Sequence, residues 1–319
     1  MVCLIYADEF LDHDTGAGHP ESPQRLRGVV EHLRGEERFR DLEWRSPSPP
    51  EISKTSPLMQ AVFRAHTPNH VALVQSLAAA GGGALDADTP VSPRSYGVAL
   101  LAVQAWLEGL DYALQAGTSA GNSAFILARP PGHHACRDHG MGFCLFSNGA
   151  IAALEALTRP GINRVAIVDW DVHHGNGTQD IVEEVGEIAY CSVHQSPAYP
   201  GTGNPLNQAS KDYELANHVL NCPVPPGTDF ASYRTQWDAQ VLPFLRDFAP
   251  DLIVVSAGYD ATAMDPLAGV DLEPENYQWL TESLLTFRCP LVLGLEGGYH
   301  VQTLAHCVDY TLRSLLSAS

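Results

Sequence analysis

The chain is poor in basic residues. Its 319 residues include 18 Lys and Arg against 37 Asp and Glu, which gives a formal net charge of −19. Because nucleic-acid partners attract basic surfaces, this balance argues against a nucleic-acid-binding protein. The same charge would attract a cationic substrate, although solubility alone also explains it.

Long apolar runs and paired cysteines are absent as well. No apolar stretch reaches the roughly 18 residues that a membrane span needs, so we expect no membrane partner. The first nine residues have no basic segment and only a short apolar run, unlike a signal peptide. The seven cysteines are scattered, odd in number and without a Cys-x-x-Cys pair, which favours a reduced, cytoplasmic protein.

An alternation of strands and helices fills most of the chain. With 45% hydrophobic residues a large core can be buried, and we expect a single domain over residues 1–319. The alternation predicts an α/β protein with a largely parallel sheet and helices on both faces. The runs typical of strands are 2–7, 124–128, 164–168, 188–193, 252–256 and 291–295. The helical patterns begin at Ser22-Pro23 and recur at 57–65, 68–80, 95–116, 148–158, 178–186, 229–247, 274–287 and 302–316, with loops at 46–57 and 81–93.

Asp169-Trp170-Asp171-Val172-His173-His174 follows the apolar run 164–168 directly. In an extended chain, residues two apart point to the same side, so Asp169, Asp171 and His173 share a face. Asp171 and His173 are then close enough to bind one metal ion, and a carboxylate with an imidazole suits Zn²⁺, Mn²⁺ or Fe²⁺. A charged strand end that leads into a solvated turn would give the same pattern.

Three other predicted strands end in chemically active residues: His133-His134, Asp260 and Tyr299. Taken singly, these could be surface histidines, a helix cap and a packed ring. However, the carboxyl ends of parallel strands meet at one edge of a sheet, where ligand sites form. Asp171, His173 and Asp260 would leave a metal position open for water and substrate, with a histidine base and a phenol beside it. These residues predict a metal-dependent hydrolase without distinguishing amide from ester, or zinc from other metals.

These motifs, in this order, resemble the histone deacetylase superfamily. The resemblance implies an arginase/deacetylase-type three-layer α/β/α fold and zinc-dependent hydrolysis of acylated amines such as acyl-lysine. Asn176 and the sequence His19-Pro20-Glu21 are more similar to the class II and bacterial amidohydrolase branch. The motifs that carry the resemblance are Arg129-Pro130-Pro131-Gly132-His133-His134, Gly142-Phe143-Cys144, Asp169 to Gly177, Pro200-Gly201-Thr202-Gly203, Ser256-Ala257-Gly258-Tyr259-Asp260 and Glu296-Gly297-Gly298-Tyr299.

The resemblance also implies a role for each matching residue. One Zn²⁺ is held by Asp171, His173 and Asp260. His134 is the general base, His133 is its electrostatic partner oriented by Asp169, and Tyr299 donates to the oxyanion. The implied substrate-binding residues are Phe143 and Tyr199 as tunnel walls, the carbonyl of Gly142, and Leu267. A structural K⁺ is implied at Asp169, Asp171, His173, Ser192 and Val193, and Arg25 is expected to border an inner channel for the released acid.

Three alternatives stay open. The first is an acetylpolyamine amidohydrolase, which the net charge favours; Leu267 opposes it, because polyamine-selective relatives carry Glu there. The second is a binding module on the same fold, which the intact His134, Tyr299 and ligand set oppose. The third is an arginase-like dinuclear manganese hydrolase, which needs further bridging carboxylates where Trp170 and Val172 stand. Tyr199 replaces a commoner Phe, which leaves the acyl preference undetermined. The sequence does not determine the oligomeric state either.

Overall fold

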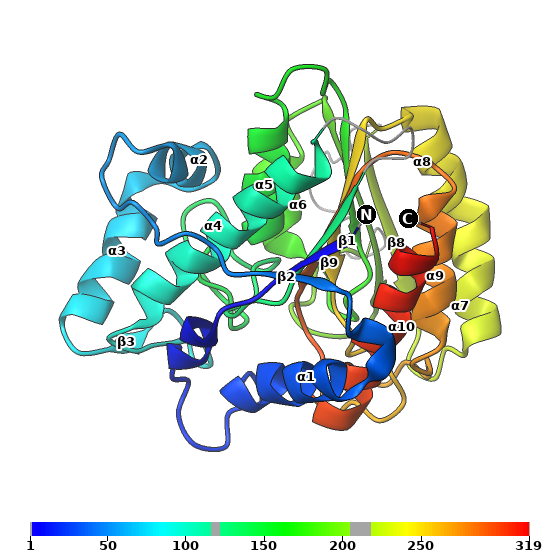
Figure 1. The fold of residues 1–319 in the computed structure, drawn as a ribbon, viewed down its shortest axis with the longest axis horizontal. Coiled ribbons are helices and arrows are strands. Elements are labelled where there is room, and N and C mark those ends of the chain that lie inside the picture. Colours follow the sequence, from blue (N-terminus) through cyan, green and yellow to red (C-terminus); the bar gives the residue numbers. More distant parts are fainter. Residues whose placement is uncertain (1, 116–121, 205–217, 319) are drawn as a thin grey trace.

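The computed structural model describes residues 2–115, 122–204 and 218–318. At its centre is an eight-stranded sheet in the order β2-β1-β5-β10-β9-β6-β7-β8, in which every pairing is parallel (Figure 1). The strands are β1 (Val2–Ile5), β2 (Glu43–Arg45), β5 (Ser123–Ile126), β6 (Val165–Asp169), β7 (Ile188–Gln195), β8 (Val219–Val224), β9 (Leu252–Ala257) and β10 (Leu291–Leu295).

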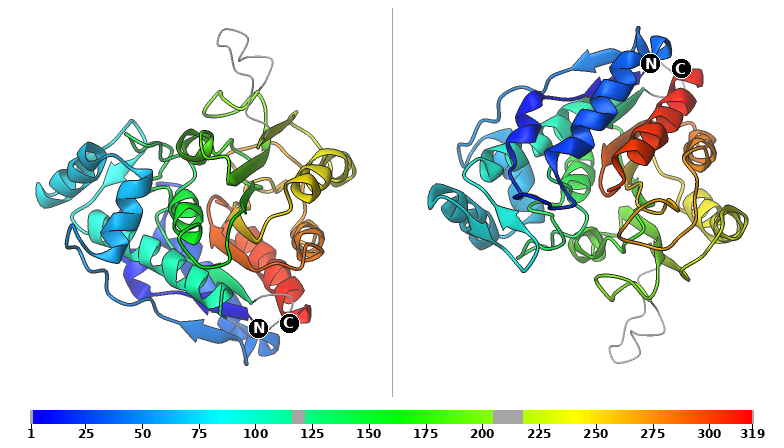
Figure 2. Two further views of the ribbon diagram at one scale, coloured as in Figure 1. Left: turned by 90° about the horizontal axis from the view of Figure 1, so that it is seen from above. Right: turned by 90° about the horizontal axis from the view of Figure 1, so that it is seen from below.

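Every residue of β5, β6, β9 and β10 is buried, because helices cover both faces of the sheet. One layer contains α4 (Ser95–Ala113), α5 (Asn148–Ala156) and α6 (Asn176–Val182), with α2 (Pro57–Ala65) and α3 (Pro68–Ala79) outside it. The other contains α1 (Pro23–Gly35), α7 (Phe230–Gln236), α8 (Leu242–Phe248), α9 (Asn276–Leu285) and α10 (Val301–Ser317), with α1 beside α10 (Figures 1 and 2). The predicted three-layer α/β/α fold with a mainly parallel sheet is confirmed.

The sequence-based prediction omitted the two edge strands, β2 and β8. β2 is three residues long with charged ends, and β8 contains Asn221 and Pro223, so neither has a continuous apolar run. Proline is tolerated at a sheet edge, where its missing N–H is not required. The predicted loop 81–93 also contains a short antiparallel pair, β3 (Gly83–Ala84) with β4 (Pro90–Val91). The predicted helix 229–247 contains a π-helical turn at Trp237–Val241 between α7 and α8.

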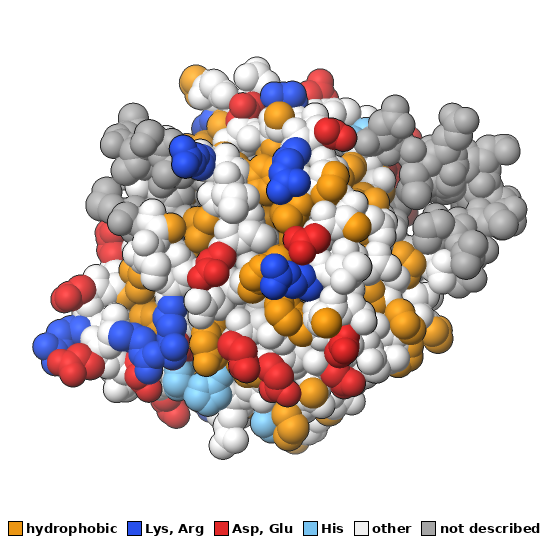
Figure 3. All heavy atoms as spheres, turned by 90° about the vertical axis from the view of Figure 1, so that its right-hand side faces the viewer, with side chains coloured by type: hydrophobic (Ala, Val, Ile, Leu, Met, Phe, Trp, Pro, Cys, Tyr) orange, Lys and Arg blue, Asp and Glu red, His pale blue; other side chains and the backbone are white. Residues whose placement is uncertain are grey.

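The surface carries charges of both signs, and the cysteines are unpaired. On the face shown in Figure 3, Arg and Lys side chains are interspersed with acidic and apolar ones. All seven cysteines are free and buried. Within the described ranges, no helix combines the length and the apolar character needed to cross a bilayer.

Candidate active site

The predicted site residues come from four strands that are neighbours in the sheet but not in the chain. β5, β10, β9 and β6 lie side by side, and their carboxyl ends lead respectively to His133-His134, Tyr299, Asp260 and the segment Asp169 to His173. The parallel topology therefore brings together residues up to 166 positions apart, at the edge of the sheet where α/β proteins bind ligands.

Asp171, His173 and Asp260 converge at the centre of this edge. One ligand atom from each lies within 4.8 Å of the others, and all three residues are buried. The Nδ1 atom of His173 is 3.2 Å from Oδ1 of Asp171 and 3.1 Å from Oδ2 of Asp260. Although burial alone would lower the pKa of His173, the two carboxylates raise it well above 6.5. Two carboxylates and one imidazole nitrogen with excess negative charge suit a divalent cation, so these residues fit the implied metal.

Backbone groups enclose these carboxylates. The N–H of Gly297 donates to Oδ2 of Asp171 at 2.8 Å, and the N–H of Val172 donates to Oδ1 of Asp260 at 2.9 Å. A Cβ atom at Gly258 would lie 2.1 Å from Oδ2 of Asp171, and one at Gly297 would lie 2.2 Å from Oδ2 of Asp260. Only glycine fits at these two positions, so the wall of the site is main chain.

His133 is placed as a charged partner. Its Nδ1 is 3.1 Å from Oδ2 of Asp169, and its Nε2 is 3.7 Å from Oδ2 of Asp171. Burial alone would lower the pKa of His133, but the charges of Asp171 and Asp169 raise it to about 10. The two carboxylates therefore favour the protonated form of His133.

His134 lies beside His133, and its pKa is shifted in the opposite direction. The two rings are 4.0 Å apart, and burial together with the charges of His133 and His173 lowers the pKa of His134 well below 6.5. Its Nδ1 is 2.8 Å from Oδ1 of Asn176, whose Nδ2 faces the sulfur atoms of Cys136 and Met141 at 3.4 Å each. Because the amide oxygen can only accept, Nδ1 carries the hydrogen and Nε2 remains able to accept a proton.

Tyr299 is close enough to Asp260 and Asp171 for their charges to affect its phenol. Burial raises its pKa well above 10, and the charges of Asp260 and Asp171 add to that rise, while Arg25 opposes it. The phenol therefore keeps its proton and can donate it in a hydrogen bond. The Arg25 guanidinium lies 4.9 Å from the centre of the ring, and the backbone N–H of Tyr299 donates to Asp265.

Aromatic rings line the approach to the site. Phe143 packs edge-on against Tyr299 and His19, with ring centres 5.8 and 4.8 Å apart, and Tyr199 packs against His134 at 5.1 Å. Gly142 has a φ of +54°, and a Cβ there would lie 2.5 Å from the His134 ring. Leu267 and Tyr199 are 41% and 40% exposed, in agreement with their predicted position at the open end.

Two buried groups in the site were not predicted from the sequence. Glu296 has one oxygen that accepts from the N–H groups of Gly132 and His133, at 2.6 and 3.2 Å, which fixes the loop that carries both histidines. Burial raises its pKa to about 7. Asp265 accepts from Tyr299 and Leu267. Glu296 belongs to the Glu-Gly-Gly-Tyr motif, but no sequence spacing indicates which backbone groups its carboxylate will reach.

Arg25 was predicted to border an inner channel, and it is 1% exposed behind Tyr299. Its Nε donates to the carbonyl of Gly298 at 2.7 Å, and it also bonds the carbonyl of Glu296 and the carboxylate of Glu21. Glu21 pairs in turn with Arg129, and although burial alone would raise the pKa of Glu21, Arg129 and Arg25 lower it to about 2. This charged cluster supports the Gly298-Tyr299 turn from beneath.

The residues predicted to bind potassium include Asp171 and His173 of the candidate metal cluster, together with Asp169, Ser192 and Val193. Asp169 on β6 is in register with Ser192 on β7, whose hydroxyl is 2.8 Å from Nδ1 of His194. Asp169 and Asp171 are both fully buried, and Val193 follows Ser192 on the same strand. The potassium site itself stays a prediction.

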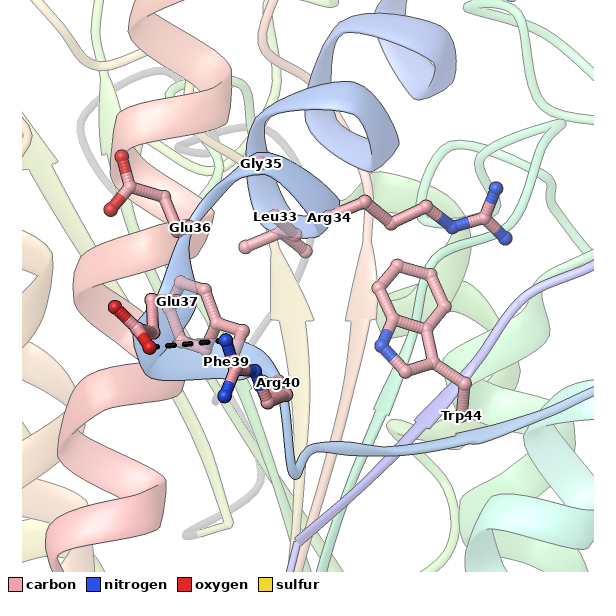
Figure 4. A pocket seen from close by; sticks show the side chains of 8 residues that line it. All are labelled: Leu33, Arg34, Gly35, Glu36, Glu37, Phe39, Arg40 and Trp44. Carbon is pink, nitrogen blue, oxygen red and sulfur yellow. Dashed lines mark ion pairs between the residues drawn. The ribbon is translucent and has the colours of Figure 1, made fainter.

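A separate pocket of about 520 Å³ lies at the carboxyl end of α1 (Figure 4). Because α1 connects two parallel strands, its carboxyl end lies near the amino end of β2, away from the catalytic edge. Arg40 pairs with Glu37 at 3.1 Å, and Arg34 lies 5.1 Å from the centre of the Trp44 ring. None of the predicted site residues lines this pocket.

Comparison with known proteins gives consistent results. The family model described as "Histone deacetylase domain" matches residues 19–315. "Uncharacterized protein slr0245" of Synechocystis sp. is 51% identical over 99% of this chain and 100% of its own length. "Histone deacetylase-like amidohydrolase" of Pseudomonas aeruginosa is 36% identical over 91% of this chain and 75% of its own length. The solved structure "Crystal Structure of HDA15 HD domain" superposes with a TM-score of 0.87 at 31% identity, and covers 100% of this chain and 90% of that one.

Proposed function

The chain belongs to the histone deacetylase family, and from this membership we propose that it is a zinc-dependent deacetylase that hydrolyses the amide of acylated amines, acetyl-lysine among them. The observation that carries the proposal is the pair of adjacent histidines with opposite charge preferences beside Asp171, His173 and Asp260. We further propose that residues 1–319 form one catalytic domain. We also propose a cytoplasmic location, because all seven thiols are free, as in a reducing compartment.

Asp171, His173 and Asp260 would hold the zinc ion. Bound there, zinc would polarise the acyl carbonyl and lower the pKa of a water molecule. Three protein ligands leave room for both oxygens. Asp169, Asp171, His173, Ser192 and Val193 would hold a potassium ion behind them.

The two histidines have different roles in the reaction. His134 is neutral and presents Nε2, so it takes the proton from the attacking water and returns it to the leaving amine. His133 keeps its own proton on the Asp169 side and stabilises the negative charge that develops nearby. Asn176 and Asp169 keep the two rings in these orientations.

The remaining residues bind and orient the substrate. The phenolic O–H of Tyr299 donates a hydrogen bond to the oxyanion that forms from the acyl carbonyl. Phe143 and Tyr199 would enclose the aliphatic chain, and the carbonyl of Gly142 would accept the N–H of the scissile amide. Leu267 would contact the substrate at the open end.

An acetylpolyamine amidohydrolase is the second candidate. Burial raises the pKa of Tyr199, and the negative charges of Asp86 and Asp88 raise it further. These two acidic residues near Tyr199 favour a cationic substrate. A binding module without catalysis is the third. One panel separates all three: acetyl-lysine peptides, acetylspermidine and longer acyl-lysine peptides, each assayed for turnover and for binding. We expect the peptides to be hydrolysed at least as well as acetylspermidine. Binding of a panel member without any hydrolysis would establish the binding module.

The identity of residue 267 provides a sharper test. A carboxylate at the open end would attract a distant ammonium group, and Leu267 cannot do so. We therefore predict that Leu267→Glu raises the ratio of acetylspermidine to acetyl-lysine hydrolysis, measured as kcat/KM. Leu267→Gln is the control, because Gln is similar in shape to Glu but uncharged. It should leave the ratio close to wild type. A wild type that strongly prefers acetylspermidine would make the polyamine the substrate instead.

A further inference from the structure

Asp265 lies outside the predicted catalytic set, yet its side chain connects three parts of the site. It belongs to the loop after β9 that also contains Asp260, and it is 6% exposed. Its Oδ2 accepts the backbone N–H of Tyr299 at 2.6 Å, and its Oδ1 accepts the backbone N–H of Leu267 at 3.0 Å. One carboxylate thus joins the metal-ligand loop, the phenol-bearing turn and the open end.

The turn that Asp265 holds has little rigidity of its own. Gly297 and Gly298 precede Tyr299, and Gly298 has a φ of +118°, a conformation that favours glycine. The N–H of Gly297 donates to Asp171 at one end of the turn, and the N–H of Tyr299 donates to Asp265 at the other. Two carboxylates therefore clamp both ends of a flexible segment.

We infer that Asp265 is a positioning residue that sets the place of the Tyr299 phenol relative to Asp171 and Asp260. This inference rests on the proposed function, because it concerns the oxyanion donor of that reaction. Both oxygens of Asp265 accept a backbone N–H, so the side chain is held at two points and suits a tether that must keep one geometry. A displacement of about 1 Å at a reacting group can cost on the order of 10²-fold in rate.

The test is a double-mutant cycle with kcat, KM, zinc content and thermal midpoint measured on the same acetyl-lysine peptide. In the wild-type background we expect Asp265→Ala to lower kcat by on the order of 10²-fold, and to change KM far less. In the Tyr299→Phe background, the same substitution should leave the residual kcat nearly unchanged, because there is no hydroxyl left to misplace. Asp265→Asn keeps one acceptor and should lose only about tenfold, which covers the case in which the alanine variant does not fold.

Asp251 offers a matched control. Its Oδ2 also accepts two backbone N–H groups, from Asn163 and Arg164 at 2.8 and 2.9 Å, but at the amino end of β9. Asp251→Ala should lower the thermal midpoint and leave kcat unchanged. An equal loss of kcat in both Tyr299 backgrounds, a loss of zinc in the Asp265 variants, or no loss at all would overturn the inference and leave the proposed function standing. A wild type that hydrolyses no acylated amine would overturn both.

Discussion

Adjacent side chains of one type can have opposite roles because different atoms face them. Two carboxylates raise the pKa of His133, while burial and the charges of His133 and His173 lower the pKa of His134, although its hydrogen bond to Asn176 opposes that shift. The sequence His-His shows neither partner. A base and an electrostatic partner could therefore be assigned from the sequence only through the family resemblance.

The strongest prediction at the residue scale concerns Tyr299. Tyr299→Phe removes only the hydroxyl, so kcat should fall by roughly 10²–10³, about 2.7–4 kcal/mol, which is typical of one oxyanion donor. Binding of substrate should weaken much less, because the bond strengthens as charge develops on the oxygen. Turnover, substrate affinity and zinc content of both proteins are the measurements. Wild-type turnover in the variant would show that the Tyr299 hydroxyl has no catalytic role and that the ring only packs.

The sequence was informative about the site to the extent that the site follows local spacing. Asp171 and His173 are two residues apart at a strand end, and Asp260 ends another strand, so the three metal-ligating residues could be proposed together. Asp265 and Glu296 could not be assigned roles, because their backbone partners lie 34 and 164 residues away in the chain. Such contacts depend on loop conformations that no local pattern determines.

At the scale of elements, buried polar side chains join helices to the loops of the site. His66, at the carboxyl end of α2, has its Nδ1 3.0 Å from the carbonyl of Cys136, and its Nε2 accepts the N–H of Ser147 at 2.9 Å. These two bonds hold both ends of the segment that contains Gly142 and Phe143. The central strands were predicted because their apolar runs are continuous; β2 and β8 were missed because edge strands need no such run.

The His66 contacts predict a dependence of stability on pH. Burial, with the charge of His70, lowers the pKa of His66 from 6.5 to about 3. Between these values the unfolded chain binds the proton and the folded protein does not, so the contribution of His66 is complete above pH 6.5 and is lost as the pH falls. We expect the stability advantage of wild type over His66→Gln to be about 2 kcal/mol smaller at pH 5 than at pH 7. Urea unfolding at both pH values checks this, and an advantage equal at both would contradict it.

For the whole molecule, the central consequence is that four neighbouring strands of the sheet, β5, β10, β9 and β6, form one buried acidic site. Its ligands come from β6 and β9, which are distant in the chain, so a metal ion bound there can stabilise only the folded protein. Ligand binding to the folded state alone raises stability by mass action.

We therefore predict one zinc ion per chain and a thermal midpoint that falls when a chelator removes it. At a free zinc concentration near 1,000 times Kd the stabilisation is about 4 kcal/mol, which corresponds to roughly 10 °C for a chain of this size. Asp260→Ala should bind less zinc, and its midpoint should respond little to the chelator. Two metal ions per chain, or full occupancy in the variant, would contradict the assignment.

The main-chain wall described above also governs how such a site can change over generations. A side chain at Gly258 or Gly297 would collide with a carboxylate at 2.1 or 2.2 Å, so we expect selection to remove most replacements there. Tyr199 and Leu267 are 40% and 41% exposed and can be exchanged without disturbing those carboxylates. Under the proposed function, we therefore expect a lineage that carries this protein to acquire new substrates by drift at the entrance, while it inherits the reaction itself unaltered.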